Sequence, residues 1–113
     1  MALEFYRGDT KKLNLTFKKK DGSPWDITGA TIWFTIKKDL NDDDDKALLQ
    51  VSVSTHTDPT NGKTVLTLSK DDTNIEPGFS YPSDFQMVDD DGNVTTLATP
   101  EVNVLPDITR RST

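Results

Sequence analysis

Hydrophobic and polar residues alternate along short stretches of this chain. The clearest alternation covers residues 30–37, where Ile32, Phe34 and Ile36 are separated by polar residues and by Trp33. A period of two residues is typical of a β-strand with one buried face. We therefore expect Ile32, Phe34 and Ile36 to point into the core, and Trp33 to lie on the opposite face of the same strand.

The same pattern predicts strands along the rest of the chain. Asp21-Gly22, Asn61-Gly62 and Asp91-Gly92 lie between them, and such dipeptides accept the backbone conformations of tight turns. Pro82 and Pro100 interrupt the later patterns, and we expect edge strands or bulges there because proline cannot donate to a ladder. The expected strands lie around residues 3–6, 13–17, 30–36, 49–53, 65–68, 81–87, 94–97 and 102–104.

A helical pattern interrupts the strands once. Ser69 precedes Asp72 by three residues, the spacing of a capping box, and this predicts one short helical turn between Lys70 and Asn74. Tyr81 follows where many sandwich domains have a tyrosine corner. Seven or eight short strands with turns at this spacing predict an all-β fold, an immunoglobulin-like two-sheet β-sandwich.

Length and composition limit the functions open to the chain. Its 113 residues, a third of them hydrophobic, suit one core, so we expect a single domain over residues 1–113. Cysteine is absent, which excludes disulfides and thiol catalysis, and no apolar run is long enough to cross a membrane. The single histidine, His56, lies where a strand runs into a turn, and we expect it exposed in a loop without a catalytic role.

The acidic residues do not form a recognisable metal or catalytic motif. Four consecutive aspartates at 42–45 predict a solvated loop, because no glycine or distant glutamate completes a calcium-binding pattern. Residues 89–93 predict a hairpin for the same reason. No spacing pairs the carboxylates considered for sugar hydrolysis. The four carboxylates considered are Glu4, Asp26, Asp84 and Glu101. We therefore predict no catalytic residue, no metal site and no cofactor.

Charge and Trp33 point to protein partners instead. The net charge is −6, which argues against nucleic-acid binding. Residues 1–38 contain eight lysines or arginines against four acids, whereas residues 39–113 contain five against fifteen. An outward tryptophan beside lysines suits a binding surface, so Trp33, Lys37 and Lys38 are the predicted partner-binding residues. Cover of Trp33 by a neighbouring loop or a lysine stem stays an alternative.

Several segments, taken in order, resemble the N-terminal domain of baseplate upper proteins and related small tail components of phages and prophages that infect Gram-positive bacteria. The resemblance covers nearly the whole chain. It rests on the order and spacing of Phe5-Tyr6-Arg7-Gly8-Asp9-Thr10, the run from Trp25 to Lys37, residues 58–63, Glu76-Pro77-Gly78, Asp84-Phe85-Gln86, residues 89–92 and residues 105–110.

This resemblance implies a structural and interaction module of a phage tail or baseplate, with no enzymatic activity. It implies other tail or baseplate proteins as partners, the central tail hub among them, and leaves self-association open. It implies a place in the virion, reached from the bacterial cytoplasm during assembly, and no membrane. The alternative is a carbohydrate-binding sandwich that contacts the host surface, for which Trp33 with Trp25 is the available aromatic pair.

Overall fold

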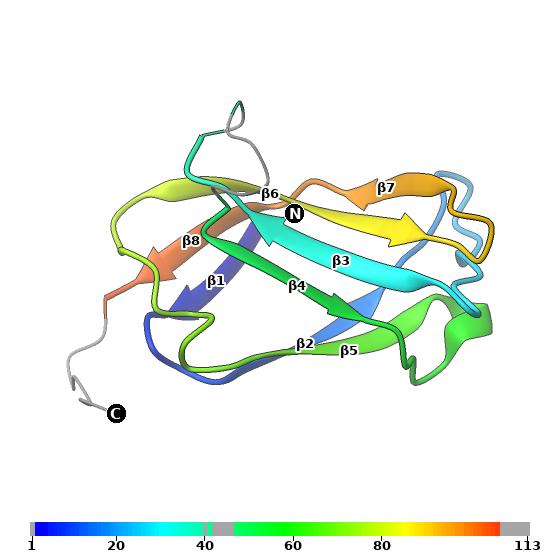
Figure 1. The fold of residues 1–113 in the computed structure, drawn as a ribbon, viewed down its shortest axis with the longest axis horizontal. Coiled ribbons are helices and arrows are strands. Elements are labelled where there is room, and N and C mark those ends of the chain that lie inside the picture. The colour runs from blue at the N-terminus through cyan, green and yellow to red at the C-terminus, as the bar shows by residue number, and fades with distance from the viewer. Residues whose placement is uncertain (1, 40, 42–46, 107–113) are drawn as a thin grey trace.

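Eight β-strands in two sheets make up the part of the chain that the computed structural model describes, residues 2–39, 41 and 47–106 (Figure 1). The all-β fold and the number of strands confirm the prediction. The strands are β1 (Ala2–Tyr6), β2 (Lys11–Thr16), β3 (Thr31–Ile36), β4 (Leu49–Val53), β5 (Lys63–Leu68), β6 (Ser80–Val88), β7 (Val94–Ala98) and β8 (Glu101–Leu105), and a 3-10 helix, η2 (Pro59–Asn61), precedes β5.

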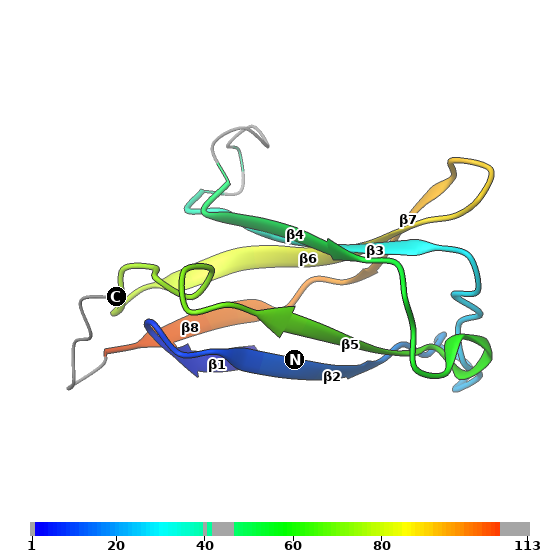
Figure 2. The ribbon, with the colours of Figure 1, turned by 60° about the horizontal axis from the view of Figure 1, so that its bottom comes forward.

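The larger sheet has six strands, in the order β1-β8-β6-β3-β4, with β7 also paired to β6. The long strand β6 pairs with β8 through residues 80–82 and with β7 through residues 85–88. β1 is parallel to β8, and the other pairs are antiparallel. β2 and β5 form the second sheet, which faces the layer of β3, β4 and β6 (Figure 2).

The core lies between the two sheets. Phe34 in β3 is paired with Phe85 in β6, and their rings stack with centroids 4.4 Å apart, while Phe17 approaches Phe85 at 5.6 Å. Ile32, Phe34 and Ile36 are all completely buried, as the alternation predicts. The other buried hydrophobic residues are Phe5, Leu13, Phe17, Ile27, Ala30, Leu49, Leu66, Leu68, Ile75, Tyr81, Phe85, Met87, Val102 and Val104.

The helical turn predicted between Lys70 and Asn74 is present as one hydrogen-bonded turn, and no regular helix forms there. Its capping box is present: Ser69 N–H donates to Asp72 Oδ2 at 2.8 Å, and Asp72 N–H donates to Ser69 Oγ at 3.1 Å. Thr73 N–H closes the turn on the Ser69 carbonyl at 3.1 Å. The chain then turns inward because Thr73 and Ile75 are both buried, and no second helical turn follows.

The predicted tyrosine corner forms at the start of β6. The buried Tyr81 donates its hydroxyl proton to the carbonyl oxygen of Glu76, five residues upstream. Burial raises the pKa of Tyr81 above its ordinary value, and the nearby Glu76 carboxylate raises it further. This hydrogen bond fixes the path by which the chain enters β6.

The two prolines occupy different positions. Pro100 lies between β7 and β8, where it interrupts the strand pattern as predicted. Pro82 lies inside the central strand β6, and the prediction of an edge or bulge there is wrong. The Pro82 carbonyl accepts from Lys37 N–H at 3.0 Å, just beyond the end of β3. The N–H and C=O groups of one residue in an antiparallel strand point to the same side, so an N–H at position 82 would also face residue 37. The proline therefore removes a hydrogen bond that would lie beyond the end of β3, and the pairing of β3 with β6 is intact.

Candidate interaction surface

Trp33 lies on the outer face of the six-stranded sheet, as the alternation predicts. It is 37% exposed, whereas its neighbours Ile32 and Phe34 are fully buried on the inner face. Ser52 of β4 and Gln86 of β6 are its cross-strand partners. The large ring is therefore held by a pleated sheet and remains accessible from outside.

A shallow depression of about 290 Å³ lies beside Trp33. Thr35, at its floor, is 9% exposed and accepts a 3.3 Å hydrogen bond on Oγ1 from Gln50 Nε2. The remaining surface combines amide, carboxylate, ammonium and aliphatic groups. The lining residues are Trp33, Thr35, Lys37, Gln50, Asp84, Gln86 and Val88.

The two predicted lysines are placed differently. Lys37 is half-buried and lines the depression together with Trp33. Lys38 is exposed, follows it in the chain and does not line the depression. The structure therefore brings two of the three predicted partner-binding residues together and leaves the third beyond the end of β3.

Sequence analysis missed the contribution of β6 to this surface. A smaller hollow of about 70 Å³ adjoins Thr35, Lys37 and Asp84, and a wider one of about 460 Å³ follows β6 toward Thr99 and Glu101. Asp84 lines all three hollows. The alternation along residues 80–88 places Asp84 and Gln86 outward, but only the pairing of β6 with β3 shows that they flank Trp33.

His56 is a structural residue and not the exposed loop histidine that the sequence predicts. It is half-buried, with Nε2 2.7 Å from the Ala30 carbonyl oxygen and Nδ1 2.9 Å from Thr64 Oγ1. The carbonyl can only accept, so Nε2 donates to it, and Nδ1 forms its hydrogen bond with the buried Thr64 hydroxyl. Both nitrogens thus join the connection after β4 to β5 and to the start of β3.

The candidate carboxylates are spread over separate elements. Asp26 accepts from both the hydroxyl and the backbone N–H of Thr28, which lower the pKa of its carboxyl group. Glu101 accepts from the Ser80 hydroxyl, and it lines the hollow of about 460 Å³ together with Asp84, an association that the spacing did not predict. Within residues 2–39, 41 and 47–106, no group of three or more histidine, aspartate or glutamate residues is arranged to hold a metal ion.

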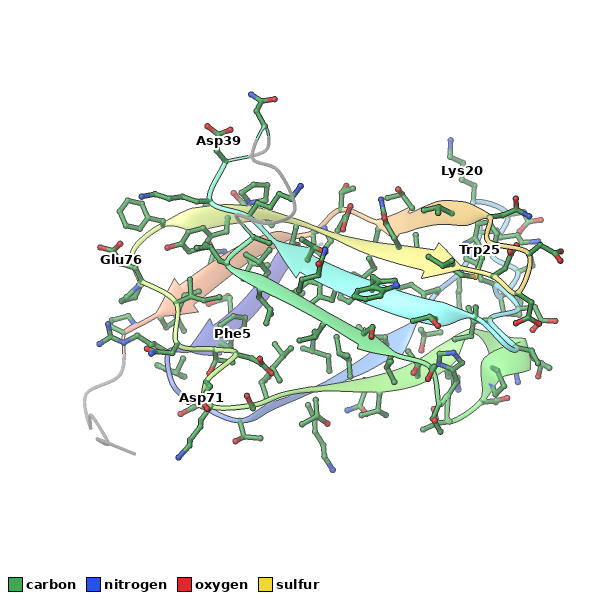
Figure 3. All side chains as sticks on the ribbon, viewed as in Figure 1. Phe5, Lys20, Trp25, Asp39, Asp71 and Glu76 are labelled. Atoms are coloured by element: carbon green, nitrogen blue, oxygen red, sulfur yellow. The ribbon has the colours of Figure 1, made fainter. Side chains whose placement is uncertain are left out.

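Trp25 does not share the depression beside Trp33. It packs partly buried against the core, with Lys19 Nζ 5.1 Å from its ring centroid, at the end of the molecule where β2 connects to β3 (Figure 3). The aromatic pair expected for a sugar-binding surface is therefore not assembled there. The acidic run at 42–45 lies outside the described residues, and the helix within them, η2, has three residues, too few to cross a bilayer.

Comparison with known proteins identifies the family. The model of the BppU N-terminal domain matches residues 2–110, which is almost the whole chain. Comparison with curated proteins gives no significant match. The family is a structural domain family of phage baseplates, and such a domain implies association with the virion. The chain therefore belongs to the family of phage baseplate upper protein N-terminal domains.

Proposed function

We propose that this chain is a single-domain docking module of a phage or prophage baseplate, which binds other virion proteins through the depression beside Trp33 and performs no catalysis. The observation that carries the proposal is a tryptophan exposed on a sheet face, beside a depression lined mostly by polar side chains. Tryptophan is enriched among the residues that dominate binding energy. The family places the chain among baseplate structural components.

The proposed architecture is immunoglobulin-like. In such sandwiches the second and fifth strands share one sheet, and the third, sixth and last strands share the other, with an extra strand beside the third in variable-type domains. The pairing β2-β5 and the order β8-β6-β3-β4 have the same arrangement. β7 and β8 then correspond to one last strand that is interrupted next to Pro100.

The lysines define the chemistry of the proposed partner. Lys37 lines the depression together with Asp84, whereas Lys38 is exposed just beyond it. We expect a virion protein with an apolar anchor point for Trp33, a carboxylate facing Lys38, and polar groups facing the side of Lys37 and Asp84. The resemblance makes the central tail hub the first partner to test. We expect the two proteins to assemble in the bacterial cytoplasm.

Titration of the domain against the hub protein tests the proposal. Trp33→Ala is expected to weaken binding by about 2 kcal/mol, roughly 30-fold, while the fold persists. Tyr6→Ala is the matched control, because Tyr6 is 53% exposed but does not line the depression. Equal weakening by both variants, or no effect of Trp33→Ala on hub binding, would contradict the proposed site.

Charge reversal separates the anchor from its rim. Lys38→Glu is expected to slow association and to change its dependence on salt, with little effect on dissociation, because rim charges steer encounter. Lys37→Glu is expected to affect both rates, since Lys37 also lines the depression. Stopped-flow or surface-based kinetics at two ionic strengths would measure the difference.

A carbohydrate-binding role is the second candidate, and one observation favours it. Trp33 lies among Gln50, Gln86 and Asp84, side chains that can hydrogen-bond sugar hydroxyl groups beside an aromatic platform. Binding of the isolated domain to a glycan array or to host cell walls would support this role. Loss of that binding in Gln86→Ala, with hub binding unchanged, would assign the depression to sugar.

A further inference from the structure

The strand β4 forms one border of the six-stranded sheet and lacks the features that protect the other borders. Among the described residues it pairs only with β3, and Figure 1 shows it at the margin of that sheet. Border strands expose unpaired N–H and C=O groups, and proteins commonly protect them with charges, prolines or bulges. The other border strands have such features. They are Glu4 in β1, Lys11 and Lys12 in β2, Lys63 in β5, and, for β7, a shift in its register with β6 between Phe85 and Gln86 of β6.

The inner side of β4 is incompletely covered. Val51 and Val53 point toward the core beside Phe34 and Ile32, yet both valines are only half-buried. Part of the surface of Val51 and Val53 therefore remains open to solvent at this border. A further strand along β4 would satisfy its backbone groups and would also cover these two side chains.

The border is electrically neutral over an unusually long stretch. Residues 47–57 contain no lysine, arginine, aspartate or glutamate, in a chain of which 28% is charged. Two copies, each with a net charge of −6, repel each other over most of their surfaces. The β4 border is where two copies can approach without opposing like charges.

The sequence of β4 is complementary to itself in the antiparallel direction. With Val51 opposite Val51 of a second copy, Leu49 lies opposite Val53 on the inner face. On the outer face Gln50 lies opposite Ser52, which pairs polar with polar. These features select a second copy as the occupant, in the antiparallel arrangement that a two-fold axis requires.

We infer that β4 pairs antiparallel with β4 of a second copy, with Val51 on the two-fold axis, so that the two large sheets become continuous. The paired segment has five residues, and the association is therefore weak and visible at high protein concentration. Two domains held in this way carry their Trp33 depressions on one shared sheet, so the pairing doubles the number of docking sites.

Cysteine cross-linking tests the register directly, because the natural chain has no cysteine. Val51→Cys is expected to form disulfide-linked dimers, since opposed residues of antiparallel strands have Cα atoms about 4.5–5.5 Å apart, within disulfide range. Val53→Cys is the matched control: its two copies would lie about 14 Å apart in this register. We expect several-fold more dimer from Val51→Cys under mild oxidation.

A mixture of Leu49→Cys and Val53→Cys provides the second test, because these positions face each other across the axis. Heterodimers should exceed both homodimers in that mixture. Equal cross-linking of Val51→Cys and Val53→Cys, or a monomer at all concentrations by sedimentation, would overturn the inference. Trp33→Ala should leave the cross-linking unchanged, so failure of the pairing and failure of hub docking are separate results.

Discussion

The inner and outer faces of β3 consist of alternate residues of one strand, yet they meet different constraints. Ile32, Phe34 and Ile36 are completely buried, and each has to fit a space that other side chains define. On the outer face, Thr35 is covered by polar neighbours, whereas Trp33 is 37% exposed. Packing explains the inner residues. No requirement of core packing explains a tryptophan on the outer face, and the docking role that we propose for it would.

Phe34→Ala should have the largest effect on the inner face. Its ring is fully buried and stacks on Phe85, so the substitution leaves a cavity at the centre of the core. We expect the free energy of unfolding to fall by about 3–5 kcal/mol. Denaturant unfolding followed by circular dichroism measures this. A loss below about 1 kcal/mol would mean that the two faces of β3 are assigned the wrong way round.

Gly62→Ala tests how tightly the end of the core is closed. Gly62 has φ of +71°, and a Cβ atom there would lie 2.5 Å from the Phe17 carbonyl oxygen and 2.9 Å from that of Trp25. Backbone strain and this collision together should cost about 2–3 kcal/mol. Gly22→Ala is the control, because Gly22 has φ of +89° with no atom within 4 Å of its added Cβ. Its cost should be limited to strain, about 1 kcal/mol; equal losses in the two variants would show that the approach to Phe17 is not tight.

These two positions show what a sequence can and cannot predict in this protein. The inward position of Phe34 follows from a period of two residues, and local rules likewise predicted the Ser69 capping box and the Tyr81 corner. The approach of Gly62 to Phe17, 45 positions earlier, depends on how two distant segments meet, which no local pattern contains.

The candidate surface divides in the same way. The outward position of Trp33 is a local property of β3. Its neighbours Gln50 and Gln86 depend on which strands pair and in which register. Local sequence therefore predicts that Trp33 faces outward, and only the sheet topology supplies the residues around it.

Tyr81→Phe should produce a smaller loss on the inner side. The variant lacks the hydrogen bond to Glu76 and should be less stable at neutral pH by about 0.5–1.5 kcal/mol. The folded-state pKa of Tyr81 is raised above 10.0. The stability that the protonated Tyr81 hydroxyl contributes is therefore fully present below that pH and is lost as the pH rises through the raised pKa. The difference between wild type and variant should therefore narrow above about pH 10. Unfolding measured from pH 7 to 11, with Tyr6→Phe at an exposed tyrosine as the control, checks both points. A difference near zero at neutral pH would show that the hydrogen bond does not matter, and a constant difference would show that the pKa of Tyr81 is not raised by burial.

Trp33→Ala should have the smallest effect on stability of the four, even though it removes the largest side chain. The substitution leaves no cavity in the core, because the Trp33 ring lies on the outer face of the sheet. The core on the inner face is filled by Ile32 and Phe34, which the substitution does not change. Only its contacts with neighbouring outer-face side chains are lost, so we expect a change below about 1 kcal/mol in the free energy of unfolding.

The same variant should lose most of the binding to the hub protein, which separates binding from folding within one strand. Measured beside Phe34→Ala, the two results form a matched pair of aromatic truncations one residue apart. A loss of stability comparable to that of Phe34→Ala would make Trp33 a structural residue, and the reason for placing the docking surface there would be gone.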